Sequence, residues 1–147
     1  MAINGNFACN VFKTGLANGT FNFSNSTAQV FKIALYTAAA TLDATTTAYT
    51  TTGETSGPGY TAGGNTLTIN VNPTTGASGN IAYFSFADST WASSTITARG
   101  ALISLFNGST NPAVCVLDFG SDKSTTGGTF TVQFPSATNT SAIIRIS

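Results

Sequence analysis

Residues 101–119 have the sequence ALISLFNGSTNPAVCVLDF, in which two apolar runs flank a short polar segment. The runs cover residues 101–106 and 113–117, and Asn107-Gly108 directly follows the first of them. Asn-Gly is the dipeptide most typical of the tight turns that join antiparallel strands. We therefore predict a hairpin of two buried strands, and this hairpin sets the fold class of the chain.

Alternating apolar and polar residues on both sides of this hairpin predict further strands. Such alternation is clearest in residues 30–36 and 130–134, and residues 20–23 are expected to pair with residues 30–36 as a second hairpin. The other strands are expected at residues 67–71, 81–86, 96–106, 114–119 and 142–146. Together with the abundant threonine, they predict an all-β fold, a β-sandwich or jelly roll of about eight strands.

Two segments interrupt this strand pattern within the single domain that residues 1–147 are expected to form. Apolar side chains four positions apart predict a short helix in an N-terminal arm of residues 1–19, and an extended strand fits the same segment as an alternative. These side chains are Ala8, Phe12 and Leu16. Residues 37–64 are dominated by Thr, Ala and Gly. They are too many for an ordinary connection, so we predict an extended Thr/Gly-rich loop over the surface.

Three of the predicted strands are apolar on both faces. They are IAYFSF at residues 81–86, ALISLF at residues 101–106 and AVCVLDF at residues 113–119. A two-layer sandwich leaves the outer face of each sheet to water, so these strands require a further covering layer. One candidate cover is the loop of residues 37–64 or the N-terminal helix. The other is a neighbouring subunit, in which case the chain is a homo-oligomer.

Charge and composition exclude several classes of partner. The 147 residues include five basic and five acidic side chains and no histidine, and the basic residues stand singly along the chain. Nucleic-acid binding requires a basic patch, so we expect no nucleic-acid partner. No apolar run approaches the roughly 20 residues that cross a bilayer, and the N-terminal residues do not resemble a signal peptide. We therefore expect no membrane partner.

The residues that usually carry catalysis or bind metals are also poorly placed. Without histidine, Cys9 and Cys115 lack their usual activating base, and the acidic residues match neither a glycosidase pair nor a calcium loop. We expect no enzymatic activity, no cofactor and no metal site. The two cysteines are predicted to be buried free thiols, with one disulfide between them as the alternative. Trp91 and Tyr83 are predicted to pack in the core, with a sugar-stacking surface as the alternative.

Seven stretches distributed over nearly the whole chain carry a family resemblance. They are CNVFKTGL (9–16), FKIALYT (31–37), ATLDATTTAYTTTGE (40–54), SGPGYTAGG (56–64), WASSTITARGAL (91–102), LDFGSDKSTTGGTFTVQFP (117–135) and AIIRI (142–146). In these stretches the chain resembles a family of small structural proteins encoded by tailed bacteriophages. The resemblance implies synthesis in the cytoplasm of a bacterial host, followed by incorporation into the virion.

Our leading hypothesis from the sequence is a capsid decoration, or cement, protein that binds the major capsid protein and bridges neighbouring subunits of the shell. The attachment arm is either residues 1–13 or residues 41–64, and large aromatic rings in these polar segments are the expected interface anchors. The candidates are Phe7, Phe12, Tyr49 and Tyr60. Because residues 1–13 precede the alternating strands, their removal is expected to leave a folded domain that attaches weakly to particles.

Two other functions stay open at this point. The chain could be a tail or neck protein, that is, an adaptor, tube or fibre-associated subunit, because ring formation uses the same exposed edges and apolar faces. In a different class, it could be a module that binds glycans on the host surface through aromatic stacking. The number of copies per particle separates the first two functions, and glycan binding that quenches Trp91 fluorescence separates the third.

Overall fold

Two antiparallel sheets and one short helix make up the computed structural model, which describes residues 3–26, 28–76 and 79–147. The larger sheet has the order β1-β7-β6-β2-β3. Its strands are β1 (Phe7–Ala8), β2 (Val30–Tyr36), β3 (Asn65–Leu67), β6 (Ser89–Phe106) and β7 (Ala113–Val132). The smaller sheet, β4-β5-β8, consists of β4 (Ile69–Thr75), β5 (Ala82–Phe86) and β8 (Ile144–Ile146). The all-β sandwich is confirmed, whereas these strand orders do not confirm a jelly roll.

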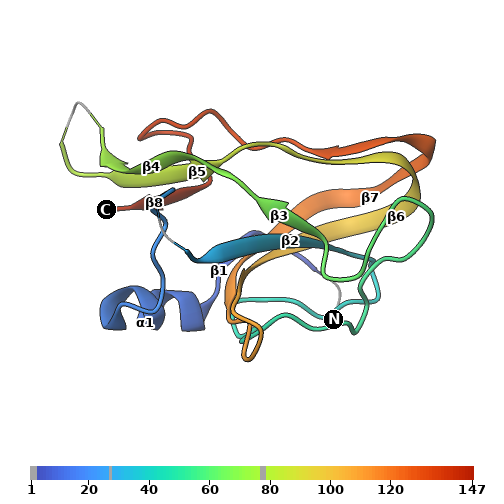
Figure 1. Ribbon diagram of the computed structural model, residues 1–147, viewed down its shortest axis with the longest axis horizontal. Coiled ribbons are helices and arrows are strands. Elements are labelled where there is room, and N and C mark those ends of the chain that lie inside the picture. Colours follow the sequence, from blue (N-terminus) through green and yellow to red (C-terminus); the bar gives the residue numbers. More distant parts are fainter. Residues whose placement is uncertain (1–2, 27, 77–78) are drawn as a thin grey trace.

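The predicted hairpin at residues 101–119 is confirmed as part of a longer ribbon. β6 and β7 pair from Ser104 opposite Ala113 to Ser89 opposite Val132, and the turn begins at Asn107-Gly108. The ribbon bends at several register shifts, and Gly120 and Gly127 adopt positive φ angles of 76° and 64° along β7. Figure 1 shows the ribbon curving from the layer of β2 into the layer of β4 and β5. It therefore contributes to both layers.

The two faces of β2 pack against different parts of the chain. Phe31, Ile33 and Leu35 face the smaller sheet, and Phe31 stacks on Phe23 with ring centroids 4.4 Å apart. The opposite face carries Ala34 and Tyr36, which are 2% and 0% exposed. A strand buried on both faces explains why this segment is apolar almost throughout.

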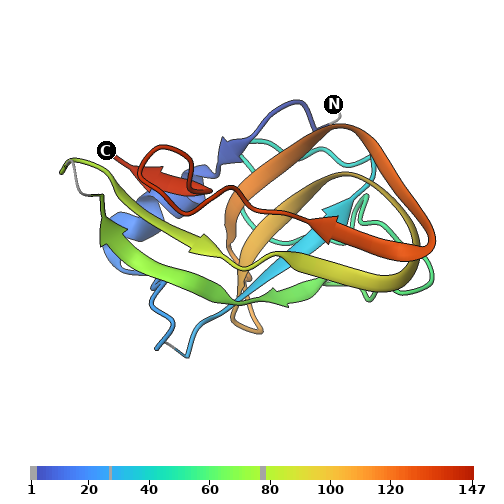
Figure 2. The ribbon, with the colours of Figure 1, turned by 90° about the horizontal axis from the view of Figure 1, so that it is seen from above.

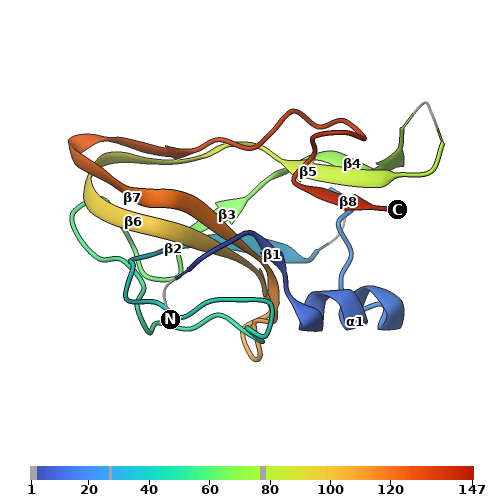
Figure 3. The same ribbon diagram turned by 180° about the vertical axis from the view of Figure 1, so that it is seen from behind.

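The loop of residues 37–64 covers that second face of the larger sheet. Figures 1 and 3 show it on the side of the sheet opposite β4 and β5. Ala40 and Leu42 are buried, Tyr36 donates a hydrogen bond through its Oη to the carbonyl oxygen of Thr50 at 2.6 Å, and the Thr55 N–H donates to the Leu35 carbonyl at 2.9 Å. The loop thus covers the second face of β2, which is the first of the two covers that the sequence left open.

The N-terminal segment contains both a strand and a helix. β1 pairs with β7, Phe7 opposite Val116, and α1 (Asn10–Asn18) begins two residues later. Gly19 ends the helix at φ 78°, a conformation that glycine adopts without strain. No helix within the described residues is both long enough and apolar enough to span a membrane. The structure therefore confirms a short helix within the predicted arm of residues 1–19.

The described part of the same segment packs into the core, which argues against the expectation that residues 1–13 are separable; residues 1 and 2 lie outside the described residues. Ile3, Cys9 and Phe12 are 1%, 0% and 3% exposed. A Cβ on Gly100 would meet the Leu117 carbonyl and the Ile3 side chain, which shows how closely the N-terminal residues pack on the β6–β7 ribbon. The N-terminal arm is therefore part of the folded unit.

Three other sequence predictions require correction. Residues 20–23 form no strand and no hairpin with β2, because Phe21 and Phe23 pack their rings into the core instead. The predicted strand of residues 67–71 breaks at Thr68 and is shared between β3 and β4. The predicted strand 114–119 and the first three residues of the predicted strand 130–134 belong to the single strand β7, which ends at Val132, because the polar residues between them continue the ladder with β6.

The accessible surface has the size expected for a folded chain of this mass. It amounts to 7165 Å². A folded monomer of 14.9 kDa is expected to expose roughly 7,000 Å². Only three large apolar side chains are exposed among the described residues, and they are Val30, Phe106 and Ile146.

Candidate functional site

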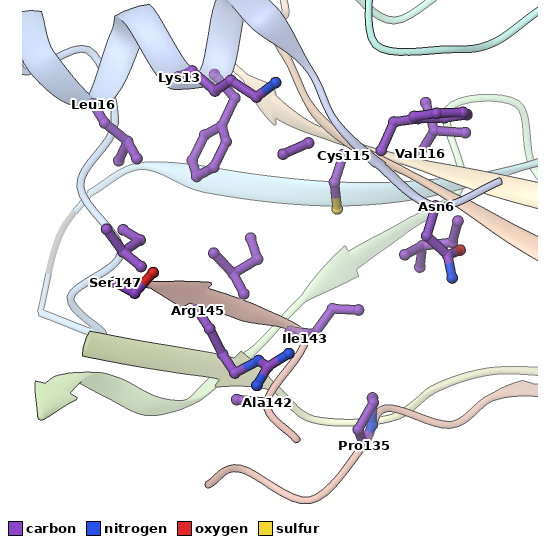
Figure 4. Close-up of a pocket in the computed structure, with 16 residues that line it drawn as sticks. Asn6, Lys13, Leu16, Cys115, Val116, Pro135, Ala142, Ile143, Arg145 and Ser147 are labelled. Carbon is purple, nitrogen blue, oxygen red and sulfur yellow. The ribbon is translucent and has the colours of Figure 1, made fainter. Parts of the chain in front are cut away.

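A groove of about 670 Å³ opens between the two sheets at one side of the sandwich. Figure 2 shows that β1 and β8, the end strands of the two sheets, lie along this same side. In Figure 4 the helix α1 and β8 form opposite walls, and the Cys115 side chain points into the space between them. The groove exists because each sheet ends there in a very short strand.

The β1 wall presents an unpaired strand edge to the groove. The Cys9 N–H donates to the Val114 carbonyl at 2.9 Å, so Cys9 belongs to the ladder with β7. In an antiparallel ladder the backbone groups of alternate residues point to opposite sides. The N–H and carbonyl of Ala8 therefore point away from β7, and Ala8, which is exposed, lines the groove. Phe12 and Leu16, one helical turn apart on α1, continue this wall.

The opposite wall is formed by β8 and the residue before it. β8 pairs with β5 along one edge, Ile144 opposite Phe84, and no other strand in the described part of the chain pairs with its second edge. Ile143 is half-buried, and Ile146 has a side chain that is 43% exposed. This wall is therefore apolar and accessible.

The charged side chains of the groove are all basic. Lys13 on α1 and Arg145 on β8 line it, and no Asp or Glu does. Both side chains are exposed and bond to neutral acceptors: Lys13 Nζ to Asn10 Oδ1 at 3.3 Å, and Arg145 Nη1 to the Thr140 carbonyl at 2.9 Å. The groove thus combines apolar walls with two cations.

The two cysteines lie on opposite faces of the larger sheet. Cys9 is opposite Val114 in the ladder and Cys115 is opposite Ala8, so Cys9 faces the loop and Cys115 faces the groove. Both thiols are free and buried, which confirms the first prediction and contradicts the disulfide. Burial is the main cause that raises the pKa of Cys9 to about 11, and it raises the pKa of Cys115 still further. Neither thiol is activated as a nucleophile.

The four predicted anchors do not gather in one surface. Phe7 is half-buried on β1 and lines the groove. Phe12 is 3% exposed and contacts Phe21 edge to face, with ring centroids 5.5 Å apart, so its ring packs mainly in the core and reaches the groove only at its wall. Tyr49 and Tyr60 are half-buried and hold the loop of residues 37–64 in place.

Glu54 is the centre that holds this loop. Tyr49 and Tyr60 donate their phenolic O–H groups to its two carboxylate oxygens at 2.6 and 2.7 Å. The Gly63 N–H donates to the same carboxylate at 2.7 Å, and Tyr60 Oη accepts from the Leu35 N–H at 2.9 Å. Hydrogen bonds to a charged acceptor are the stronger kind, so this cluster ties the loop to β2.

High pH is expected to destabilise the chain through these tyrosines. Burial is the main cause that raises the pKa of Tyr36, Tyr49 and Tyr60 above the ordinary value of 10.0, for Tyr49 to about 12. An unfolded chain ionises its phenols near pH 10, so above that pH the folded state binds more protons and the free energy of unfolding falls. We expect unfolding, followed by circular dichroism, to accompany tyrosinate absorbance as the pH rises through 12. Complete ionisation near pH 10 with an unchanged dichroism spectrum contradicts this expectation.

Three of the other four acidic residues, Asp43, Asp88 and Asp118, have local structural roles. Asp118 Oδ1 accepts from Arg99 Nε at 3.1 Å, and Asp88 Oδ1 accepts from the Phe134 N–H at 2.8 Å. Hydrogen bonds from Thr45 hold the pKa of Asp43 below its usual value. Within residues 3–26, 28–76 and 79–147, no three His, Cys, Asp or Glu side chains gather where they could hold a metal ion.

Trp91 packs in the core rather than on a sugar-stacking surface. It is 3% exposed and stacks with Tyr60 at 6.1 Å between ring centroids. Phe130 contacts its ring edge to face at 6.1 Å. The predicted core packing is confirmed for Trp91, and the stacking platform that included it is wrong.

Comparison of the chain with models of protein families, with curated proteins and with solved structures found no match. Among the residues of the groove between β1 and β8, the sequence predicts Phe7 and Phe12 as anchors, and the candidate arm of residues 1–13 also contains Asn6, Ala8 and Lys13. The groove depends on which strands end the two sheets, and no local pattern in the sequence carries that information.

Proposed function

We propose that this chain is a structural protein of a tailed-bacteriophage particle and that it decorates the capsid. In this role many copies bind the major capsid protein, and each copy bridges neighbouring subunits of the shell. The family resemblance over nearly the whole sequence supports the proposal. The balance of five basic and five acidic residues supports it as well, because contacts built from apolar burial and strand pairing do not depend on a large net charge.

One structural observation supports the proposal. The groove between β1 and β8 combines two strand edges that have no strand partner among the described residues, apolar walls and a volume of about 670 Å³ at the rim of the sandwich. Unpaired strand edges bind other chains through backbone hydrogen bonds, and apolar pockets beside them select side chains. A surface of this kind is suited to holding a second protein rather than to a reaction.

Cementing follows from attachment at more than one point. A subunit that contacts two capsid proteins makes the second contact at a high effective concentration, so its total binding is much tighter than either contact. Because the subunit binds the assembled shell and not separated capsid proteins, it stabilises the assembled state by mass action. Because the chain carries few charges, the contacts that it makes outside the groove depend only weakly on the salt concentration.

The copy number in purified virions tests this proposal. We expect quantitative mass spectrometry of particles from the phage that encodes the chain to find hundreds of copies per particle, with the major capsid protein as the internal reference. A count of about six or twelve copies would place the chain in a ring of the neck or tail, the alternative that uses the same surfaces. Absence of the chain from purified particles would overturn the proposal in both forms.

A further inference from the structure

We propose that the groove between β1 and β8 receives an extended segment of a neighbouring virion protein, one that presents apolar side chains and at least one carboxylate. This inference rests on the proposed function and specifies the contact by which the chain is held. Three features of the groove support it independently: its backbone edges, its apolar walls and its charge.

The backbone edges fit an added strand. The N–H and carbonyl of Ala8 point away from β7, so the outer edge of the two-residue strand β1 is open to a further strand. β8 leaves its outer edge open on the same side of the sandwich (Figure 2). An extended segment laid along this side gains backbone hydrogen bonds and closes the gap between the sheets.

The walls fit apolar side chains of that segment. Leu16 and Ile143 are half-buried, and Ile146, 43% exposed, is one of the three large apolar side chains that are exposed among the described residues. Cys115 forms the floor, and its thiol behaves there as a small apolar group because burial raises its pKa well above the usual range. In an extended segment alternate side chains point into such a space.

The charge of the groove selects a carboxylate on the partner. Lys13 and Arg145 are two of the five basic residues of the chain, and none of its five acidic residues lines the groove. Arg99, by contrast, lies outside the groove and already has a carboxylate partner in Asp118 at 3.1 Å. Because both groove cations bond only to neutral acceptors, a carboxylate is the complementary group that another protein can supply.

Competitive incorporation into particles tests the inference. Host cells that express a variant chain are infected with the phage that encodes the wild-type chain. Mass spectrometry then measures the ratio of variant to wild-type chain in purified particles and in the soluble lysate. We expect the double variant Lys13→Glu/Arg145→Glu and the single variant Ile146→Asp to be depleted from particles about tenfold or more. The matched controls are Lys123→Glu and Val30→Asp, which place the same changes at exposed positions outside the groove.

The possible outcomes distinguish a failure of the groove inference from a failure of the proposed function. Both control variants should enter particles in proportion to their expression, and the groove variants should melt within a few degrees of the wild type. Equal incorporation of groove and control variants overturns the groove inference and leaves the proposed function standing. Absence of the wild-type chain itself from particles overturns the proposed function. If the purified chain dimerises in sedimentation and only the groove variants are monomeric, the occupant is a second copy, which overturns the assignment to another protein.

Discussion

A chain that lacks residues 1–13 is expected to lose its cooperative unfolding transition. The deletion removes β1 and three side chains from the core, Ile3, Cys9 and Phe12, each exposed by 3% or less. Truncating one large buried side chain costs about 2–5 kcal/mol, and a whole domain is stable by only about 5–15 kcal/mol. Removing two such side chains, a buried thiol and a strand together is therefore expected to cost more free energy than the folded state has in reserve.

Thermal unfolding followed by circular dichroism measures this effect on the purified truncated chain. The matched control is Lys13→Ala, which changes an exposed residue of the same segment and is expected to leave the midpoint within a few degrees of the wild type. A truncated chain that still melts cooperatively near the wild-type temperature would show that residues 1–13 are a separable arm. Attachment to particles could then be tested on the truncated chain itself.

The N-terminal segment illustrates what its sequence could and could not indicate. The four-residue spacing of Ala8, Phe12 and Leu16 predicts a helix, which the structure confirms at Phe12 and Leu16, whereas Ala8 lies in β1. Whether the segment is separable depends on contacts with distant residues. Ile3 packs beside Gly100, and the Asp118 N–H donates to Asn6 Oδ1 at 2.8 Å. No pattern within the first 13 residues encodes those partners.

The strands show the same division between local and distant information. Alternation and the Asn107-Gly108 turn predicted the strands of the central hairpin, which pair as expected. The polar stretch between the two apolar ends of β7 was interpreted as a break, because exposed strand residues give no apolar signal. Residues 20–23 were interpreted as a strand for the opposite reason, since Phe21 and Phe23 are buried without any ladder.

The candidate site was the least predictable part of the chain. Large aromatic residues in polar segments were interpreted as anchors for another protein, but Tyr49 and Tyr60 anchor their own loop through Glu54. Lys13 and Arg145 stand at opposite ends of the sequence, and only the placement of α1 and β8 brings both of them to one groove. A docking surface formed by sheet edges follows from topology, which a single sequence specifies only weakly.

Replacing Phe23 with alanine is expected to lower the free energy of unfolding by about 3–5 kcal/mol. Phe23 is 3% exposed and stacks on Phe31 of β2 and on Phe84 of β5, with ring centroids 4.4 and 4.1 Å apart. It also contacts Phe12 of α1 edge to face at 5.8 Å. One side chain thus joins the helix to both sheets, and its removal leaves a cavity that no neighbouring ring can fill without leaving its own contacts.

Equilibrium unfolding in urea measures the change, and Phe106→Ala is the matched control. Phe106 is 45% exposed and contacts the Lys32 ammonium at 4.3 Å from its ring centroid, so the same truncation is expected to cost about 1 kcal/mol or less there. Phe23→Leu retains most of the apolar volume and should lose less than half as much as Phe23→Ala. Equal losses at positions 23 and 106 would mean that residues 20–24 are only loosely held. In that case the aromatic cluster between α1 and the two sheets would not be what fixes the helix wall of the groove.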